Sequence, residues 1–71
     1  MFNRRLVVHL RWTGATTPSV KIYRNQVRIA RVDNSGTYSD TLTEHGIYTY
    51  QVCEARTGNC SNEVHVRFGG P

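Results

Sequence analysis

The chain has 71 residues with 9 Lys or Arg against 5 Asp or Glu, so its formal net charge is +4. This length suits one small domain, residues 1–71, and no stretch rich in Pro, Ser or like charge divides it. No apolar run is long enough to span a membrane, and the apolar run at residues 6–10 is too short for the core of a signal peptide.

The first predicted element is a half-buried strand from Leu6 to Trp12, in which apolar and polar residues alternate. Trp12 is the only tryptophan and carries a large apolar area, so we expect it in the core. Residues 13–19 contain Gly14 and Pro18 and are typical of a loop. The inward side of the strand would carry Leu6, Val8, Leu10 and Trp12.

A tight hairpin is predicted next, between a strand at residues 20–24 and a strand at residues 27–32. Asn25 and Gln26 would form its turn, although glycine adopts the positive φ of a primed turn with less strain than Gln26. We expect the later strand to be a short edge strand, because interspersed arginines oppose unwanted pairing. In the earlier strand Val20 and Ile22 point inward, while the later strand could turn in either Val27, Ile29 and Arg31 or Arg28, Ala30 and Val32.

The second half of the chain predicts a turn at residues 33–36, a short strand at 37–42 and a corner at 43–46. A long hairpin follows, with strands at residues 47–53 and 62–68. Only one face of this hairpin is apolar, so a second layer must cover it, and the number of short strands indicates an all-β sandwich. Its inward residues would be Tyr48, Tyr50, Val52, Val64, Val66 and Phe68, and its outward residues Thr49, Gln51, Glu63, His65 and Arg67.

The two cysteines, Cys53 and Cys60, stand at the two sides of the neck of this hairpin, where a disulfide forms easily. A core this small benefits from such a staple. A disulfide indicates an oxidising compartment, either extracellular or periplasmic, so we expect a secreted protein. Two free thiols in a cytosolic protein remain the alternative, while a metal site is not expected, because the cysteines and the three histidines lack ligand spacing.

The chain resembles the fibronectin type III family of immunoglobulin-like sandwiches over residues 6–68, in particular the short accessory domains of secreted bacterial hydrolases. The resemblance is carried by Trp12, by VKIYRN at residues 20–25, by SGTYSDT at 35–41 and by the corner from Leu42 to Tyr48. It implies a tyrosine corner, in which the Tyr48 hydroxyl bonds back to the corner backbone. The chain departs from the family at its start, because the family's first strand is missing or reduced to residues 1–5, which would leave one sheet short of an edge strand.

Catalysis is not expected from this sequence. A nucleophilic site needs a hydroxyl, an imidazole and a carboxylate that meet in a cleft beside an oxyanion hole. The chain has no glycine-framed serine, no phosphate-binding loop and no cofactor motif. The candidates would be Ser39, Asp40 and His45, or His9 and His65 with any of the acids.

A binding face is the better candidate site. In the fibronectin type III family, which the chain resembles, the third, sixth and seventh strands are neighbours. This arrangement would place the outward residues of these strands side by side. Tyr23 could stack on a sugar ring, and Lys21 and Arg67 could hold acidic groups. Arg56 lies at the tip of the hairpin loop, where this architecture often places recognition residues. The candidate binding residues are therefore Lys21, Tyr23, Gln51, His65, Arg67 and Arg56. An ordinary solvated sheet face is the alternative.

Together these features predict a non-catalytic module without a cofactor, cut from a larger secreted protein. The resemblance implies that such a module spaces, stabilises or orients a neighbouring catalytic domain of a bacterial hydrolase that degrades protein or polysaccharide. Weak binding of a carbohydrate or protein substrate is the alternative function. We expect a monomer, and we do not expect a nucleic-acid partner, because the basic residues are scattered rather than interleaved with aromatics along a groove.

Overall fold

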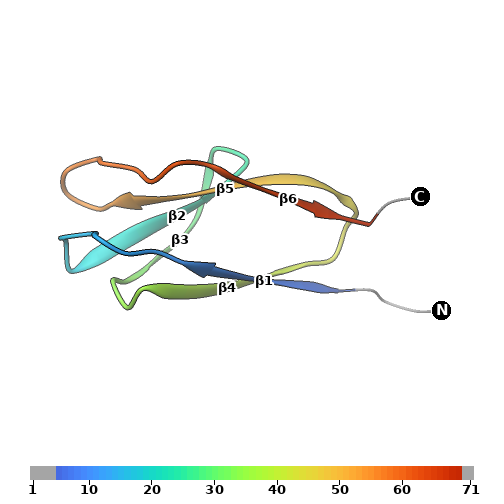
Figure 1. The fold of residues 1–71 in the computed structure, drawn as a ribbon, viewed down its shortest axis with the longest axis horizontal. Coiled ribbons are helices and arrows are strands. Elements are labelled where there is room, and N and C mark those ends of the chain that lie inside the picture. Colours follow the sequence, from blue (N-terminus) through green and yellow to red (C-terminus); the bar gives the residue numbers. More distant parts are fainter. Residues whose placement is uncertain (1–4, 70–71) are drawn as a thin grey trace.

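A computed structural model describes residues 5–69 of the chain. The described residues form six antiparallel strands and no helix, in two sheets that lie face to face as a small β-sandwich (Figure 1). One sheet has the order β3-β2-β5-β6 and the other pairs β1 with β4. The strands are β1 (Leu6–Arg11), β2 (Ser19–Arg24), β3 (Val27–Asp33), β4 (Thr37–Leu42), β5 (Gly46–Glu54) and β6 (Val64–Phe68). The predicted remnant of a first strand, residues 1–5, lies outside the described residues except for Arg5, which is not in a strand.

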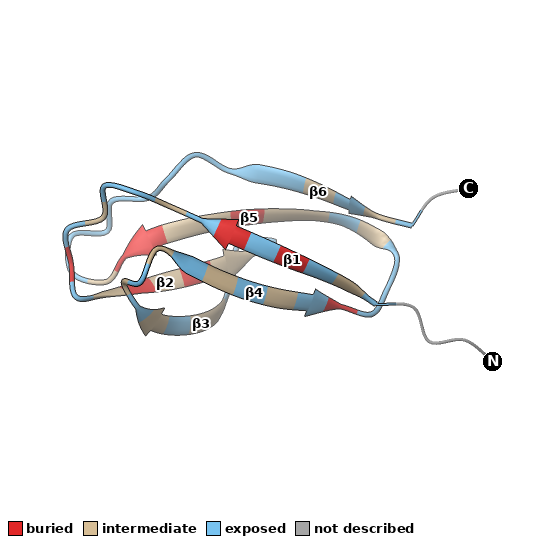
Figure 2. Cartoon of the chain, turned by 60° about the horizontal axis from the view of Figure 1, so that its bottom comes forward, coloured by how far each residue is buried: buried red, intermediate tan, exposed pale blue. Residues whose placement is uncertain are grey.

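The core lies between the two sheets, where the inward residues of β1 and β2 are buried as predicted, except that Leu6 is half-buried (Figure 2). Val20 and Ile22 are fully buried, and Val7, His9 and Arg11 point outward from β1. Alternation therefore identified the faces of both strands correctly, since successive side chains of a strand point to opposite sides. The buried cluster consists of Val8, Leu10, Val20, Ile22, Leu42 and Tyr50.

Trp12 lies just beyond the end of β1 and is half-buried against this core rather than at its centre. Its indole N–H donates to the Asn34 side-chain oxygen at 2.8 Å. The Asn34 amide in turn donates to the carbonyls of Ala15 and Thr17. Trp12 and Asn34 thus join the loop after β1 to the turn after β3, at the end of the sandwich where polar loops meet.

The β2–β3 hairpin turns at Asn25 and Gln26, which both have positive φ, 51° and 67°. Asn25 also binds the neighbouring strand, because its N–H donates to the Thr49 carbonyl and its side chain accepts from the Thr49 N–H. A register shift within the hairpin sets Ala30 opposite Ile22 and Arg28 opposite Tyr23. The extra residue, Ile29, resets the alternation, which explains why neither set of inward residues predicted for β3 is correct as a whole. As expected, β3 is an edge strand.

The β5–β6 hairpin confirms the prediction for its first strand and corrects it for its second. Tyr50 is 1% exposed, but Val64 directly opposite it is 49% exposed, so Val64 is not a core residue. The reason is the short opposing layer: β1 is the last described strand of its sheet, and no described strand lies over β6 at this point. Tyr48, Val52, Val66 and Phe68 are half-buried against the core.

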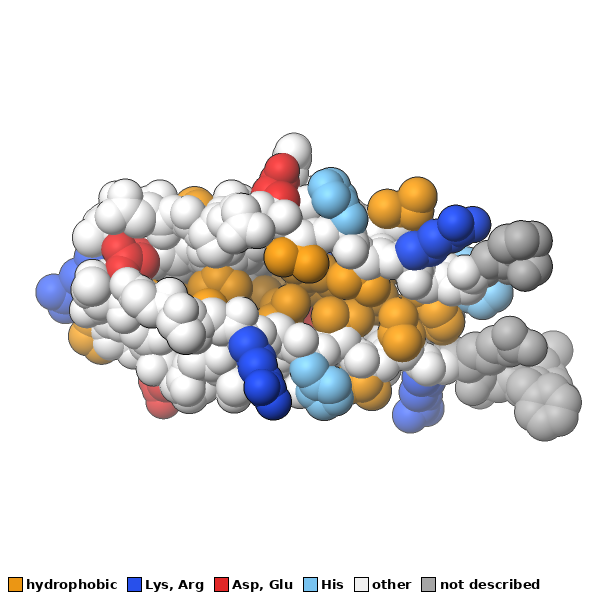
Figure 3. Space-filling model, viewed as in Figure 1, with side chains coloured by type: hydrophobic (Ala, Val, Ile, Leu, Met, Phe, Trp, Pro, Cys, Tyr) orange, Lys and Arg blue, Asp and Glu red, His pale blue; other side chains and the backbone are white. Residues whose placement is uncertain are grey.

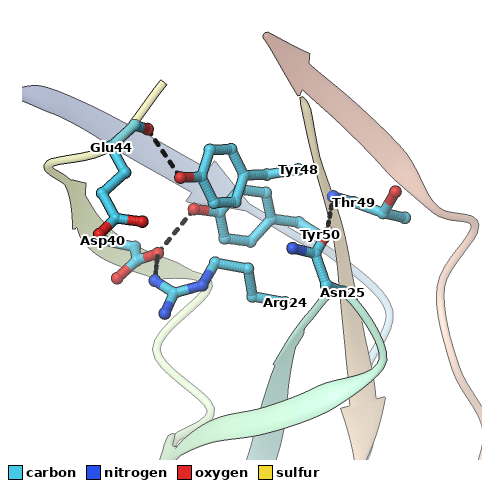
Figure 4. A network of polar contacts seen from close by, with 7 residues as sticks. All are labelled: Arg24, Asn25, Asp40, Glu44, Tyr48, Thr49 and Tyr50. Atoms are coloured by element: carbon cyan, nitrogen blue, oxygen red, sulfur yellow. Dashed lines mark hydrogen bonds and ion pairs between the residues drawn. The ribbon is translucent and has the colours of Figure 1, made fainter. Parts of the chain in front are cut away.

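The disulfide predicted between Cys53 and Cys60 is present, with an S–S distance of 2.06 Å. It links the end of β5 to the segment that leads into β6, and both cysteines of the chain are used. The tyrosine corner is also present: the Tyr48 hydroxyl donates to the Glu44 carbonyl at 2.7 Å (Figure 4). Both links were placed correctly from the sequence.

The sandwich is elongated, with extents of 43 × 18 × 17 Å. β1 begins and β6 ends at the same end of the long axis, beside the corner that connects β4 to β5 (Figure 1). The loops after β1, β3 and β5 gather at the opposite end. The described chain thus enters and leaves at one end and presents three loops at the other.

Candidate binding face

The candidate site is the outer face of the four-stranded sheet, which is the side turned away from β1 and β4. Strand register brings its predicted residues together from separate parts of the chain. Tyr23 pairs with Gln51 across β2 and β5, and Thr49 pairs with His65 across β5 and β6. Side chains of paired residues point to the same side of a sheet. Lys21, Tyr23, Gln51, His65 and Arg67 therefore share this face, as the sequence predicted.

Part of this face is hollowed beside the loop that follows β5. The hollow has a volume of about 510 Å³, and its lining includes Lys21, Tyr23, Gln51 and Arg56. Four of the predicted binding residues thus meet in one place. His65 and Arg67 do not line the hollow, because they lie farther along the sheet on β6. The loop residue Arg56 joins the strand residues because β5 ends directly beneath it.

The side chains of the outer face differ in whether they already have partners. The Gln51 amide donates to the Ser61 carbonyl at 2.8 Å, and His65 Nδ1 lies 3.2 Å from the Thr49 hydroxyl. Lys21, Tyr23 and Arg56 have no side-chain hydrogen bond or ion pair among residues 5–69. These three polar groups are therefore available to a ligand, whereas Gln51 and His65 help to hold the sheet.

The outer face is more basic than the sequence analysis predicted. Arg28 pairs with Tyr23 and Arg31 pairs with Lys21, and both arginines are exposed. Arg31, which one reading of β3 turned inward, is thus an outward residue. The bulge at Ile29 hid this arrangement, because it breaks the alternation by which faces are read from sequence. The face as a whole carries Lys21, Arg28, Arg31, Arg56 and Arg67.

The residues considered for catalysis serve separate contacts. His9 Nδ1 lies 2.9 Å from the Ser39 hydroxyl on the outer side of the β1–β4 sheet. Asp40, the next residue along, points to the other side of the same strand, where it accepts from Arg24 and Tyr50 (Figure 4). His45 packs edge-on against Phe68 with ring centroids 5.0 Å apart. The predicted hydroxyl, imidazole and carboxylate therefore do not meet in a cleft.

Glu54 is a buried carboxylate that the sequence analysis did not single out. It accepts hydrogen bonds from the Thr57 hydroxyl, from the Thr16 N–H at 2.5 Å and hydroxyl at 2.9 Å, and from the Asn59 amide at 3.4 Å. These donors, the Thr57 hydroxyl foremost, lower the pKa of Glu54 to about 2. Glu54 thus fixes the loops after β1 and β5 around the disulfide. In the sequence, the only sign of this role is the presence of threonines in those two loops.

Comparisons of the chain with models of protein families, with curated proteins and with solved structures found no match. The resemblance to fibronectin type III domains therefore stays a prediction from the residues given above. Within residues 5–69, no group of three His, Cys, Asp or Glu side chains is placed to hold a metal ion. The same residues contain no helix with the length and hydrophobicity needed to cross a membrane.

Proposed function

We propose that the chain is a non-catalytic accessory module of a larger secreted protein, and that its outer face makes weak contacts with a substrate or partner. The observation that carries this proposal is the meeting of Lys21, Tyr23 and Arg56 at one hollow, without partners among the described residues. An aromatic ring beside two cations suits a sugar ring that bears acidic groups, or an acidic stretch of an extended polypeptide.

Several features support a binding role over a catalytic one. Asp40 and Glu54, the two carboxylates with defined partners, are used in hydrogen bonds that hold strands and loops together. A structural disulfide supports an oxidising compartment and hence secretion. Two face-to-face antiparallel sheets and the Tyr48 corner bond support the fibronectin type III-like assignment, and with it a neighbouring hydrolase domain as the structure that the module serves.

The shape of the molecule favours orienting over spacing among the accessory roles. The described chain enters and leaves at one end of a sandwich 43 Å long, with three loops at the other end (Figure 1). A module attached in this way projects from its neighbours and does not separate them along its long axis. Its loops and outer face are then presented away from the point of attachment.

A chemical-shift titration of the isotope-labelled protein tests this proposal. Soluble polysaccharides with and without acidic groups, an unfolded protein and a single-stranded oligonucleotide are added in turn. We expect shifts at Lys21, Tyr23, Gln51 and Arg56 with at least one of the first three ligands. Loss of these shifts in Lys21→Ala and Arg56→Ala, but not in the control Arg11→Ala on the other sheet, would assign the site. No shifts at millimolar ligand would contradict a binding face, and a salt-sensitive response to the oligonucleotide alone would indicate phosphate contacts instead.

A further inference from the structure

We propose that the free edge of β1, together with the partly apolar groove between β1 and β6, binds an extended peptide segment in which apolar residues alternate with acidic ones. This site is separate from the outer face and does not depend on the function proposed above. Strand addition of this kind uses main-chain hydrogen bonds for affinity and side-chain pockets for selectivity.

The two long sides of the sandwich are closed to different degrees. On one side, Asp40 of β4 accepts from Arg24 of β2 at 2.8 Å and from the Tyr50 hydroxyl at 2.6 Å, so a charged network joins the layers (Figure 4). On the other side β1 faces β6 across a gap, and none of the described residues pairs with the outer edge of β1. Figure 3 shows apolar side chains exposed along this gap, in a hollow between the two layers.

The backbone of β1 is suited to accept another strand. The Trp12 N–H donates to the Gly36 carbonyl at 3.1 Å, directly beyond the last β1–β4 pair, Arg11 with Thr37. Hydrogen-bonded and non-hydrogen-bonded pairs alternate along an antiparallel ladder. Leu10 and Val8 therefore form hydrogen-bonded pairs with β4, as Trp12 does with Gly36. Val7, His9 and Arg11 then direct their N–H and C=O groups to the open edge. An unpaired row of this kind is a template for strand pairing.

The groove is hollowed beside the end of β1, where apolar side chains stand next to polar ones such as Arg11 and Gln51. Two hollows of about 250 and 290 Å³ share Trp12, Thr13, Val52 and Ser61 in their linings. Leu10 and Tyr50 lie at the floor of the first, and Val64 forms its wall on β6. Val64 is 49% exposed although it stands opposite the buried Tyr50, which means that its core-facing side remains uncovered. A strand beside β1 would cover it with every second side chain.

Charge decides which peptide fits. The outward residues of an added strand would lie beside His9 and Arg11, which are exposed on the outer side of the β1–β4 sheet. Acidic residues at the outward positions complement this pair, and like charges directly opposite would repel. A second copy of the chain is disfavoured on the same ground, because each copy carries a net charge of +4.

The test uses a soluble synthetic peptide of about eight residues that alternates Val or Leu with Glu, the usual length of a strand. With peptide at ten times its Kd, amide exchange at Val7, His9 and Arg11 should slow about tenfold, and shifts should appear on β1 and at Val64. A peptide of the same composition with its apolar residues grouped at one end, and an alternating peptide with Lys in place of Glu, should bind at least about tenfold more weakly.

Two variants separate binding from folding. Val7→Pro removes an N–H that faces the open edge, so it should fold and lose peptide binding, since edge strands tolerate proline. Val64→Lys should weaken binding about tenfold or more, while Ile47→Lys, at a residue 70% exposed on the outer face, should not. The proposal is overturned by no binding at millimolar peptide, by equal binding of the grouped peptide, by shifts confined to the outer face, or by protection of the three amides through self-association.

Discussion

At the scale of single residues, the sandwich is held by two carboxylates with different tasks. Asp40 accepts from the Arg24 guanidinium and the Tyr50 hydroxyl, and so joins β4 to β2 and β5 across the core. Burial, aided by the bond to Asp40, raises the pKa of Tyr50, and the bond to Asp40 raises the pKa of Arg24. Tyr50 therefore stays a neutral donor and Arg24 a cation at neutral pH.

Removal of the Tyr50 hydroxyl should measure the strength of this junction. Tyr50→Phe keeps the buried ring but leaves Asp40 without one donor, so we expect a loss of about 1 to 3 kcal/mol in the free energy of unfolding. The measurement is chemical denaturation. Tyr38→Phe is the matched control, because the Tyr38 hydroxyl has no hydrogen bond among the described residues, and it should change stability by less than about 0.5 kcal/mol. Equal effects of both substitutions would show that the Asp40 bond contributes nothing.

Glu54 predicts how stability depends on pH. Its pKa is about 2 in the folded protein against an ordinary value of 4.5, so its stabilising effect is complete above pH 4.5 and is lost as the pH falls toward 2. Between pH 6 and 2, the melting temperature should decrease as the pH drops from 4.5 toward 2. Glu54→Gln should make this decrease smaller and should lower stability at neutral pH. Glu63→Gln, at an exposed position, serves as the control. An unchanged acid profile in Glu54→Gln would contradict this role.

At the scale of elements, local pattern predicted most of the structure. The bounds of β4, the turn at Asn25 and Gln26, the Tyr48 corner and the cysteine pair all follow from residues close in sequence. The facing of β3 could not be predicted, because the bulge at Ile29 depends on how β3 pairs with β2. For the same reason Arg28 and Arg31 were not recognised as members of the candidate site.

The contribution of the disulfide to stability can be measured by reducing it. Cys53 and Cys60 are seven residues apart, so loop closure limits their stabilisation to roughly 2 kcal/mol. We expect reductant to lower the free energy of unfolding by about this amount, and both thiols to resist alkylation until reductant is added. Cys53→Ser with Cys60→Ser should behave like the reduced protein and should not respond to reductant. Ready alkylation without reductant would contradict both the bridge and the secreted assignment.

At the scale of the whole molecule, the unequal sheets explain what sequence pattern could not. Alternation correctly turned Val64 toward the core side of β6. Val64 is nevertheless half exposed, because β1 is the last strand of the opposing sheet among residues 5–69. How many strands cover a face is a property of the assembled sandwich, so the pattern within one strand does not encode it. The candidate site follows the same rule: its members were predicted strand by strand, but the hollow that unites Lys21, Tyr23 and Arg56 depends on how the loop after β5 folds back.

Amide hydrogen exchange along β1 in the free protein tests most directly whether the sandwich is open on this side. We predict alternation: Val8 and Leu10, bonded to β4, should exchange at least about 100-fold more slowly than Val7, His9 and Arg11, whose N–H groups face water. Uniform protection along β1 at low protein concentration would contradict the account, because it would mean that the edge and its groove are already covered.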